Sequence, residues 1–230
     1  MSKHNVIIKY SVDIWAKNIS EARKIQKILR SKVTIKPLSF KPEYICGVDA
    51  SFSESNIFAC ASLFKLPELI HIEDSIVKMK LEFPYIPNFL SFREGKAFME
   101  AIKNLKIKPQ IILFDGQGIA HPLYFGIASH IGVLLDIPSI GCAKSRLVGE
   151  YEEPKKEKGS YSYLYYRGKI VGAVLRTKTG VKPIFVSPGH LIDIESSIEV
   201  VLKVTKQYRI PEPLRKAHQR TTIERYKIAD

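Results

Sequence analysis

Apolar and polar side chains follow two different periods along the first third of the chain. Residues 13–31 carry apolar side chains at three- and four-residue steps, which predicts an amphipathic helix. Segments 44–52, 56–66 and 69–83 are short, rich in β-forming residues and joined by only a few residues. Links of this length favour an antiparallel meander of three strands.

The second third alternates between helical and strand patterns. Residues 92–105 predict a helix, and the fully apolar run 110–115 is typical of a central parallel strand covered on both faces. Pro122 is a favourable first residue for a helix that extends to about Leu135. Residues 137–141 predict a further short strand.

The last third completes one domain that spans residues 1–230. The elements predicted there are a hairpin at 162–177 with its turn at Arg167-Gly168, a strand at 183–187, and helices at 193–208 and 213–227. The whole order predicts an α/β fold, a mixed sheet with a three-stranded antiparallel meander plus parallel strands, flanked by helices. Such an order also describes the ribonuclease H-like architecture.

Composition adds a strong positive charge to this picture. The 230 residues include 36 basic and 23 acidic side chains, for a formal net charge of +13. Basic surfaces attract polyanions, although a lysine-rich proteome produces the same excess. No apolar run approaches the roughly 20 residues of a membrane span, and residues 1–15 show no export signal. Three cysteines without metal-ligand spacing suit a reducing interior, so we expect a cytoplasmic protein. We also expect no association with membranes, and a monomer, although the sequence does not give the oligomeric state.

Three carboxylates are candidates for chemistry. Asp49 interrupts an apolar strand, Asp115 ends the run IILFD, and Glu94 opens the helix predicted at 92–105. Asp115 also suits a turn residue before glycine, and Glu94 also suits the positive end of a helix. If the strands of Asp49 and Asp115 are neighbours, the carboxylates meet at one edge of the sheet, where ligands bind in open α/β folds. Clustered carboxylates repel one another, and hard oxygen ligands suit Mg²⁺, with Mn²⁺ as a substitute.

Two basic side chains add to this candidate centre. Lys144 follows a predicted strand and could steady a phosphate, although a plain surface lysine is the simpler interpretation. His218, in the last predicted helix, suits a ligand or proton acceptor, or equally a solvated helix face. The sequence contains neither phosphate-loop nor dinucleotide-binding glycine motif, so nothing supports the use of ATP or NAD.

Several separate blocks together resemble one known family. GVDASF, PYIPNFLSFREG, ILFDGQGIAHP, GCAKSRLVG, SPGHLIDIESS and RIPEPLRKAH follow the order found in endonuclease V, from about residue 13 to 222. The resemblance implies a ribonuclease H-like fold and a DNA repair activity. The expected reaction is the Mg²⁺-dependent hydrolysis of the second phosphodiester bond 3′ to a deoxyinosine.

The resemblance also assigns roles to individual residues. It places Asp49 and Asp115 on the metal with Glu94 at the same centre. Lys144 matches the family lysine, and His218 stands where some relatives carry Asp.

The block PYIP matches the loop that the family inserts into the duplex as a wedge. The residues expected to bind the substrate are Tyr85, Ile86 and Pro87 in the wedge, and Gly116, Gly118 and His121 around the hypoxanthine. Two prolines stiffen this loop, although a proline loop packed into the core would show the same composition. Asn88 and Ser91 depart from the Gly and Ala that are common in the family. Asn tolerates a positive φ better than most residues, so the turn is expected to survive.

Two other functions compete with lesion repair. A metal nuclease on the same fold could act on inosine-containing RNA or on branched DNA, because a fold does not determine a substrate. A nucleic-acid binder without enzymatic activity would explain the net charge but gives no reason for Asp49 within an apolar strand.

Overall fold

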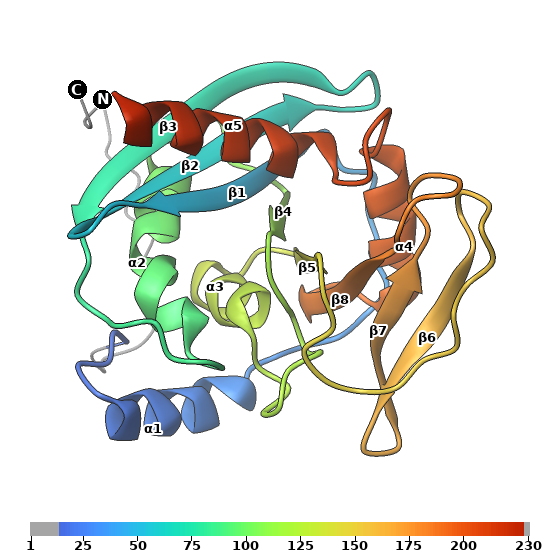
Figure 1. Cartoon of the computed structure of the whole chain (residues 1–230), viewed down its shortest axis with the longest axis horizontal. Coiled ribbons are helices and arrows are strands. Elements are labelled where there is room, and N and C mark those ends of the chain that lie inside the picture. The colour runs from blue at the N-terminus through green and yellow to red at the C-terminus, as the bar shows by residue number, and fades with distance from the viewer. Residues whose placement is uncertain (1–13, 228–230) are drawn as a thin grey trace.

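The computed structural model describes residues 14–227, which form one eight-stranded mixed sheet covered by helices (Figure 1). The strands are β1 (Tyr44–Phe52), β2 (Asn56–Lys65), β3 (Ile70–Lys80), β4 (Ile111–Phe114), β5 (Ser139–Ala143), β6 (Tyr161–Tyr166), β7 (Lys169–Leu175) and β8 (Ile184–His190). Their order across the sheet is β3-β2-β1-β4-β5-β8-β7-β6. Strand β4 runs parallel to β1 and to β5, and the other neighbours are antiparallel. The predicted meander and central parallel strand are confirmed.

Helices cover both faces of the sheet. They are α1 (Ile19–Arg30), α2 (Leu90–Lys103), α3 (Ile127–Leu135), α4 (Ile194–Lys203) and α5 (Glu212–Tyr226). Helices α1, α2 and α3 pack on the face that carries Val48 and Phe114, whereas α4 and α5 pack on the face that carries Ile45 and Leu113. Side chains alternate between the faces of a strand, so both faces of β1 and β4 are buried.

The hairpin predicted at Arg167-Gly168 is confirmed. Arg167 has φ 50° and Gly168 has φ 72°, which is the left-handed pair of a two-residue hairpin turn between β6 and β7. Within residues 14–227, no helix has both the length and the apolar character that crossing a bilayer requires.

The predicted helix at 122–135 begins too early in the sequence. Helix α3 starts only at Ile127, and residues 119–126 form a connection instead. Tyr124 adopts φ 54°, which a right-handed helix cannot include, and the Gly126 N–H donates to the carbonyl of Gly118 at 2.9 Å. A proline at a favourable starting position therefore did not decide where the helix begins.

Smaller differences occur at other boundaries. Helix α1 starts after Asn18, whose side chain accepts a hydrogen bond from the Glu21 N–H, so the predicted range 13–31 was too long. Residues 1–13 lie outside the described residues. They include the first residue of that predicted range and most of the segment considered for an export signal. Strand β3 ends at Lys80 rather than residue 83, and β8 continues through Pro188 to His190.

A fully buried histidine links α3 to the start of α2. The His130 ring lies among aromatic neighbours, with ring centres 5.1 Å from Phe92 and 5.2 Å from Phe125. Its Nδ1 is 2.9 Å from the Ser91 Oγ, so the Ser91 hydroxyl has a hydrogen-bond partner here. Burial lowers the pKa of His130 to about 3, because the charged imidazole would lose its hydration.

This burial predicts a loss of stability in acid. The unfolded chain binds a proton at His130 below about pH 6.5, whereas the folded chain does so only near its lowered pKa of about 3. The free energy of unfolding therefore decreases as the pH is lowered from about 6.5 to about 3. A His130→Gln variant should show a dependence of unfolding free energy on pH that is shallower by up to about 1.4 kcal/mol per pH unit. Urea unfolding of both proteins at about pH 6 and about pH 4.5 measures this; equal slopes would contradict the prediction.

Candidate active site

The parallel pairing of β1 with β4 brings two carboxylates together. Val48 pairs with Phe114 in this ladder, and Asp49 and Asp115 are the residues that follow each of them. Neighbouring strands lie about 4.8 Å apart, so the two acids occupy adjacent positions at the carboxyl end of the pair. The predicted adjacency of these strands is confirmed.

Glu94 reaches the same region from α2. It lies beyond the first turn because the helix begins at Leu90, so the expectation that Glu94 opens the helix was wrong. The side chain is buried, and burial together with the negative charges of Asp49 and Asp115 raises its pKa to about 8. The carboxylates of Asp49, Asp115 and Glu94, which lie on β1, just after β4 and on α2, are therefore close enough to repel one another.

Each of the two aspartates has a basic partner. His218 Nδ1 lies 2.7 Å from the Asp49 Oδ2, and the Lys144 Nζ forms an ion pair with the Asp115 carboxylate. Burial and the charge of Asp115 raise the pKa of Asp49, while the hydrogen bond with His218 lowers it. All five residues predicted for catalysis thus lie in one connected group.

Helix α5 is held against the sheet at several points, and this contact positions His218. Gly47 permits the close approach, because a Cβ at this position would lie 2.3 Å from the carbonyl carbon of Pro213. The Ser51 hydroxyl donates to the carbonyl of Thr221 at 2.7 Å, one helical turn beyond His218. Sequence patterns revealed none of these contacts, since they join residues about 170 positions apart.

The residue types at this site suit a hard cation, but their side chains do not converge on one point. Within residues 14–227 no three His, Cys, Asp or Glu groups converge closely enough to hold a metal as they stand. Yet Asp49 and Glu94 are both disfavoured as anions by burial and by neighbouring carboxylates, and a divalent cation would relieve this. Oxygen ligands of this kind suit Mg²⁺ or Mn²⁺.

The expected wedge lines a cavity of about 210 Å³ beside these acids. Tyr85 is 69% exposed, which excludes a loop whose tyrosine is packed in the core, whereas Ile86 packs partly against the core. The cavity is lined on one side by residues 85–88 and on the other by Gly116 and His121. Gln117, Ser145 and Arg146 also line it, and no motif in the sequence marked them as candidates.

His121 joins the wedge to the opposite wall of the cavity. Its Nε2 lies 3.1 Å from the carbonyl oxygen of Asn88, while its Nδ1 accepts the Leu123 N–H at 3.2 Å. Burial lowers the pKa of His121 to about 4, so the neutral ring donates through Nε2. Asn88 has φ 71°, as its tolerance for the left-handed region predicted, and its carbonyl also accepts from Gln26 Nε2 at 3.0 Å.

Gly118 stands apart from the other expected substrate-binding residues. It does not line the cavity, and its N–H donates to the Ser187 Oγ at 2.7 Å. A Cβ here would lie 2.1 Å from the carbonyl oxygen of Pro188. The glycine therefore permits close packing of the β4–α3 connection on β8.

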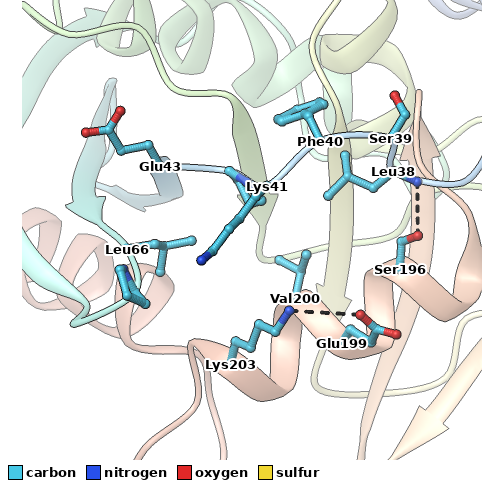
Figure 2. Close-up of a pocket in the computed structure, with 12 residues that line it drawn as sticks. Leu38, Ser39, Phe40, Lys41, Glu43, Leu66, Ser196, Glu199, Val200 and Lys203 are labelled. Atoms are coloured by element: carbon cyan, nitrogen blue, oxygen red, sulfur yellow. Dashed lines mark hydrogen bonds and ion pairs between the residues drawn. The ribbon is translucent and has the colours of Figure 1, made fainter.

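A larger cavity of about 740 Å³ lies near the other end of β1 (Figure 2). Residues 38–43 form one wall, and α4 contributes Ser196, Glu199 and Lys203. Asp49 lies five residues beyond Tyr44 on β1, which corresponds to roughly 16 Å of strand. This cavity contains none of the catalytic candidates.

Comparisons with known proteins agree with this geometry. The family model described as Endonuclease V matches residues 27–219. Endonuclease V of Dictyoglomus thermophilum is 52% identical over 199 residues, covering 86% of this chain and 87% of that protein. The chain belongs to the endonuclease V family. It is accordingly a nuclease with a ribonuclease H-like fold.

Solved structures of this family superpose closely. The crystal structure of Endonuclease V from Streptomyces avermitilis has a TM-score of 0.89 at 34% identity, covering 94% of this chain and 96% of that one. Endonuclease V of Ciona intestinalis has a TM-score of 0.83 at 29% identity, covering 93% of this chain and all of that one. The Ciona protein is in complex with a 24mer DNA that contains an inosine followed by a ribo-adenosine.

The close approach of α5 predicts that Gly47→Ala inactivates the enzyme. The added methyl group would push α5 away from β1 and separate His218 from Asp49, at a cost of about 1–3 kcal/mol in stability. Gly172→Ala is the matched control, because its Cβ would lie 2.4 Å from the Val186 carbonyl in a part of the sheet remote from α5. Both variants should lose unfolding free energy, but only Gly47→Ala should lose nuclease activity below its unfolding temperature. Equal activity in the two variants would contradict this.

Proposed function

We propose that this endonuclease V nicks DNA containing deoxyinosine at the second phosphodiester bond 3′ to the lesion, with Mg²⁺ as cofactor. The supporting observation is the group of Asp49, Asp115 and Glu94 beside a cavity bordered by an exposed, proline-stiffened loop. The cavity of about 210 Å³ is smaller than the roughly 300–1,000 Å³ of drug-sized sites, as suits one extruded base.

The basic side chains have separate tasks in this proposal. Asp49, Asp115 and Glu94 would hold Mg²⁺, which would supply positive charge to the leaving oxygen and to the attacking water. Asp49 holds the His218 ring through Nδ1, which leaves Nε2 to accept a proton. Lys144 forms an ion pair with Asp115, and its ammonium group can pair with an incoming phosphate instead.

Recognition depends on the wedge. Tyr85 and Ile86 enter the gap that the extruded base leaves in the stack, and the base occupies the cavity next to Gly116 and His121. Unstacking costs a few kcal/mol and least for a mispaired base, which favours the lesion over normal pairs. The hydrogen bond between His121 and the Asn88 carbonyl holds the wedge at a fixed position relative to the cavity wall.

Inosine-containing RNA is the second candidate substrate. The observation that favours it is the ribo-adenosine that follows the inosine in the nucleic acid bound by the Ciona relative. Recognition of a 2′-OH at that position would distinguish the two substrates.

Incubation with Mg²⁺ and a duplex carrying one deoxyinosine should give a single nick at the second phosphodiester bond on its 3′ side. Asp49→Asn and Asp115→Asn should reduce the single-turnover rate by about a hundredfold or more, because each removes an anionic ligand of similar shape. Inosine RNA and a four-way junction tested beside the DNA rank the substrates. Absence of a nick with Mg²⁺ and with Mn²⁺ would overturn the proposal, and a preference for the junction would redirect it.

Tyr85→Ala should lower the preference for inosine duplex over undamaged duplex by about tenfold, which is the value of one stacking contact. Tyr165→Ala is the control, since Tyr165 is also exposed, at 49%, but lies on the edge strand β6 and does not line the cavity. Competition binding without metal measures both variants. A loss of preference in both, or in neither, would contradict a stacking role for Tyr85.

A further inference from the structure

Basic side chains form a continuous strip beside the wedge. On α1, Arg23, Lys27 and Arg30 are all exposed and follow steps of four and three residues, so they share one face of the helix. At 1.5 Å per residue they extend over roughly 10 Å, a length that spans about three phosphates of one DNA strand. The opposite face of α1 is buried in the core.

The strip continues into a cluster of cations on two tyrosine rings. The Arg30 guanidinium lies 5.7 Å from the centre of the Tyr124 ring, and the Lys169 Nζ lies 5.8 Å from the same centre. That ring is 5.7 Å from the Tyr166 ring. Arg167, at the tip of the β6–β7 hairpin, lies 5.1 Å from the Tyr166 ring centre. Three chain segments remote in sequence therefore meet here, along the lower edge of the molecule (Figure 1).

This strip is directly connected to the base-binding cavity. The Tyr124 N–H donates to the carbonyl of His121 at 2.8 Å, and His121 lines the cavity. On α1, the Gln26 side chain donates to the carbonyl of Asn88 in the wedge. Tyr124 holds φ 54°, a conformation uncommon outside glycine, which turns its ring toward Tyr166 rather than continuing into α3.

Among residues 14–227, the cations of the strip lack acidic partners. No carboxylate of residues 14–227 forms an ion pair with Arg23, Lys27, Arg30, Arg167 or Lys169, whereas lysines at 65, 96 and 203 each have one. The positive charges of Arg30, Arg167 and Lys169 lie close together on these two tyrosine rings and repel one another. An anion bound among them would offset this repulsion. Cations interleaved with aromatic rings are typical of protein surfaces that bind nucleic acid.

We propose that this basic strip binds the phosphate backbone of the DNA duplex on one side of the lesion, several nucleotides from the cut. The strip lies outside the carboxylate group and the cavity, so it contributes to affinity and orientation rather than to chemistry. The inference extends the proposed function, since it names the surface that holds the flanking duplex while the wedge acts.

The test is the salt dependence of DNA binding in a variant with Arg30, Arg167 and Lys169 each changed to Gln. Each lost phosphate contact should make the slope of log affinity against log salt shallower by about 0.9, hence by about 2.7 for three contacts. The control variant changes Lys103, Lys106 and Lys108 to Gln, which removes the same charge from exposed positions at the end of α2 and in the connection to β4. Its slope should change by less than about 1.

Duplex length then locates the contact. With the wild type and the triple variant, shortening the duplex on one side of the lesion should abolish the difference in affinity, and shortening the other side should leave it intact. The single-turnover rate of the triple variant at saturating enzyme should match that of the wild type, because the carboxylate group is unchanged.

The outcomes separate this inference from the proposed function. Equal slopes for the two triple variants, or a difference that survives both truncations, would overturn the strip as a phosphate-binding surface. Binding slopes are measured without metal and on undamaged duplex as well, so they stand even if the wild type fails to nick inosine DNA. A triple variant that binds normally but cuts slowly would also overturn the inference.

Discussion

Repulsion among buried carboxylates is the constraint around which this molecule is organised. Strands β1 and β4 must run parallel and in register for Asp49 and Asp115 to lie side by side, and α2 brings Glu94 to the same place. Burial makes the negative charges of Asp49 and Glu94 more costly than in water, and the neighbouring carboxylates add to that cost. The fold offsets part of it with His218 and Lys144, which lie on one aspartate each. A divalent cation in the same position would offset much more of it.

The same constraint explains why the C-terminal helix matters. Helix α5 approaches β1 so closely that only glycine fits at position 47, and the Ser51 side chain fixes the helix at Thr221. The helix is far from β1 in sequence, so no local signal marks His218 as a partner of Asp49. A histidine with 60% of its side chain exposed would otherwise resemble any residue on a solvated helix face.

Short polar links join the wedge to the cavity wall and to α1. The carbonyl of Asn88 accepts hydrogen bonds from both Gln26 and His121, so α1 and the cavity wall are both tied to the wedge at this one carbonyl. Because His121 is buried and neutral, its donor and acceptor roles are settled by its two backbone partners. Tyr124, whose ring lies close to the cations of Arg30 and Lys169, is only three residues further along the chain.

Periodicity and turn chemistry determined much of this protein from sequence alone: the meander, the central apolar strand, the hairpin at Arg167-Gly168 and the left-handed Asn88 all depend on interactions within a few residues. The family blocks identified the five catalytic candidates, but not their contacts. Tertiary structure alone decided that α3 begins at Ile127 instead of Pro122, that Gly118 serves packing rather than the cavity, and that Gln117 and Arg146 line it. The start of α3 depends on the hydrogen bond between Gly126 and Gly118, whereas the packing of Gly118 and the lining of the cavity depend on contacts 28 to 69 residues apart. Contacts of this kind leave no period in the sequence.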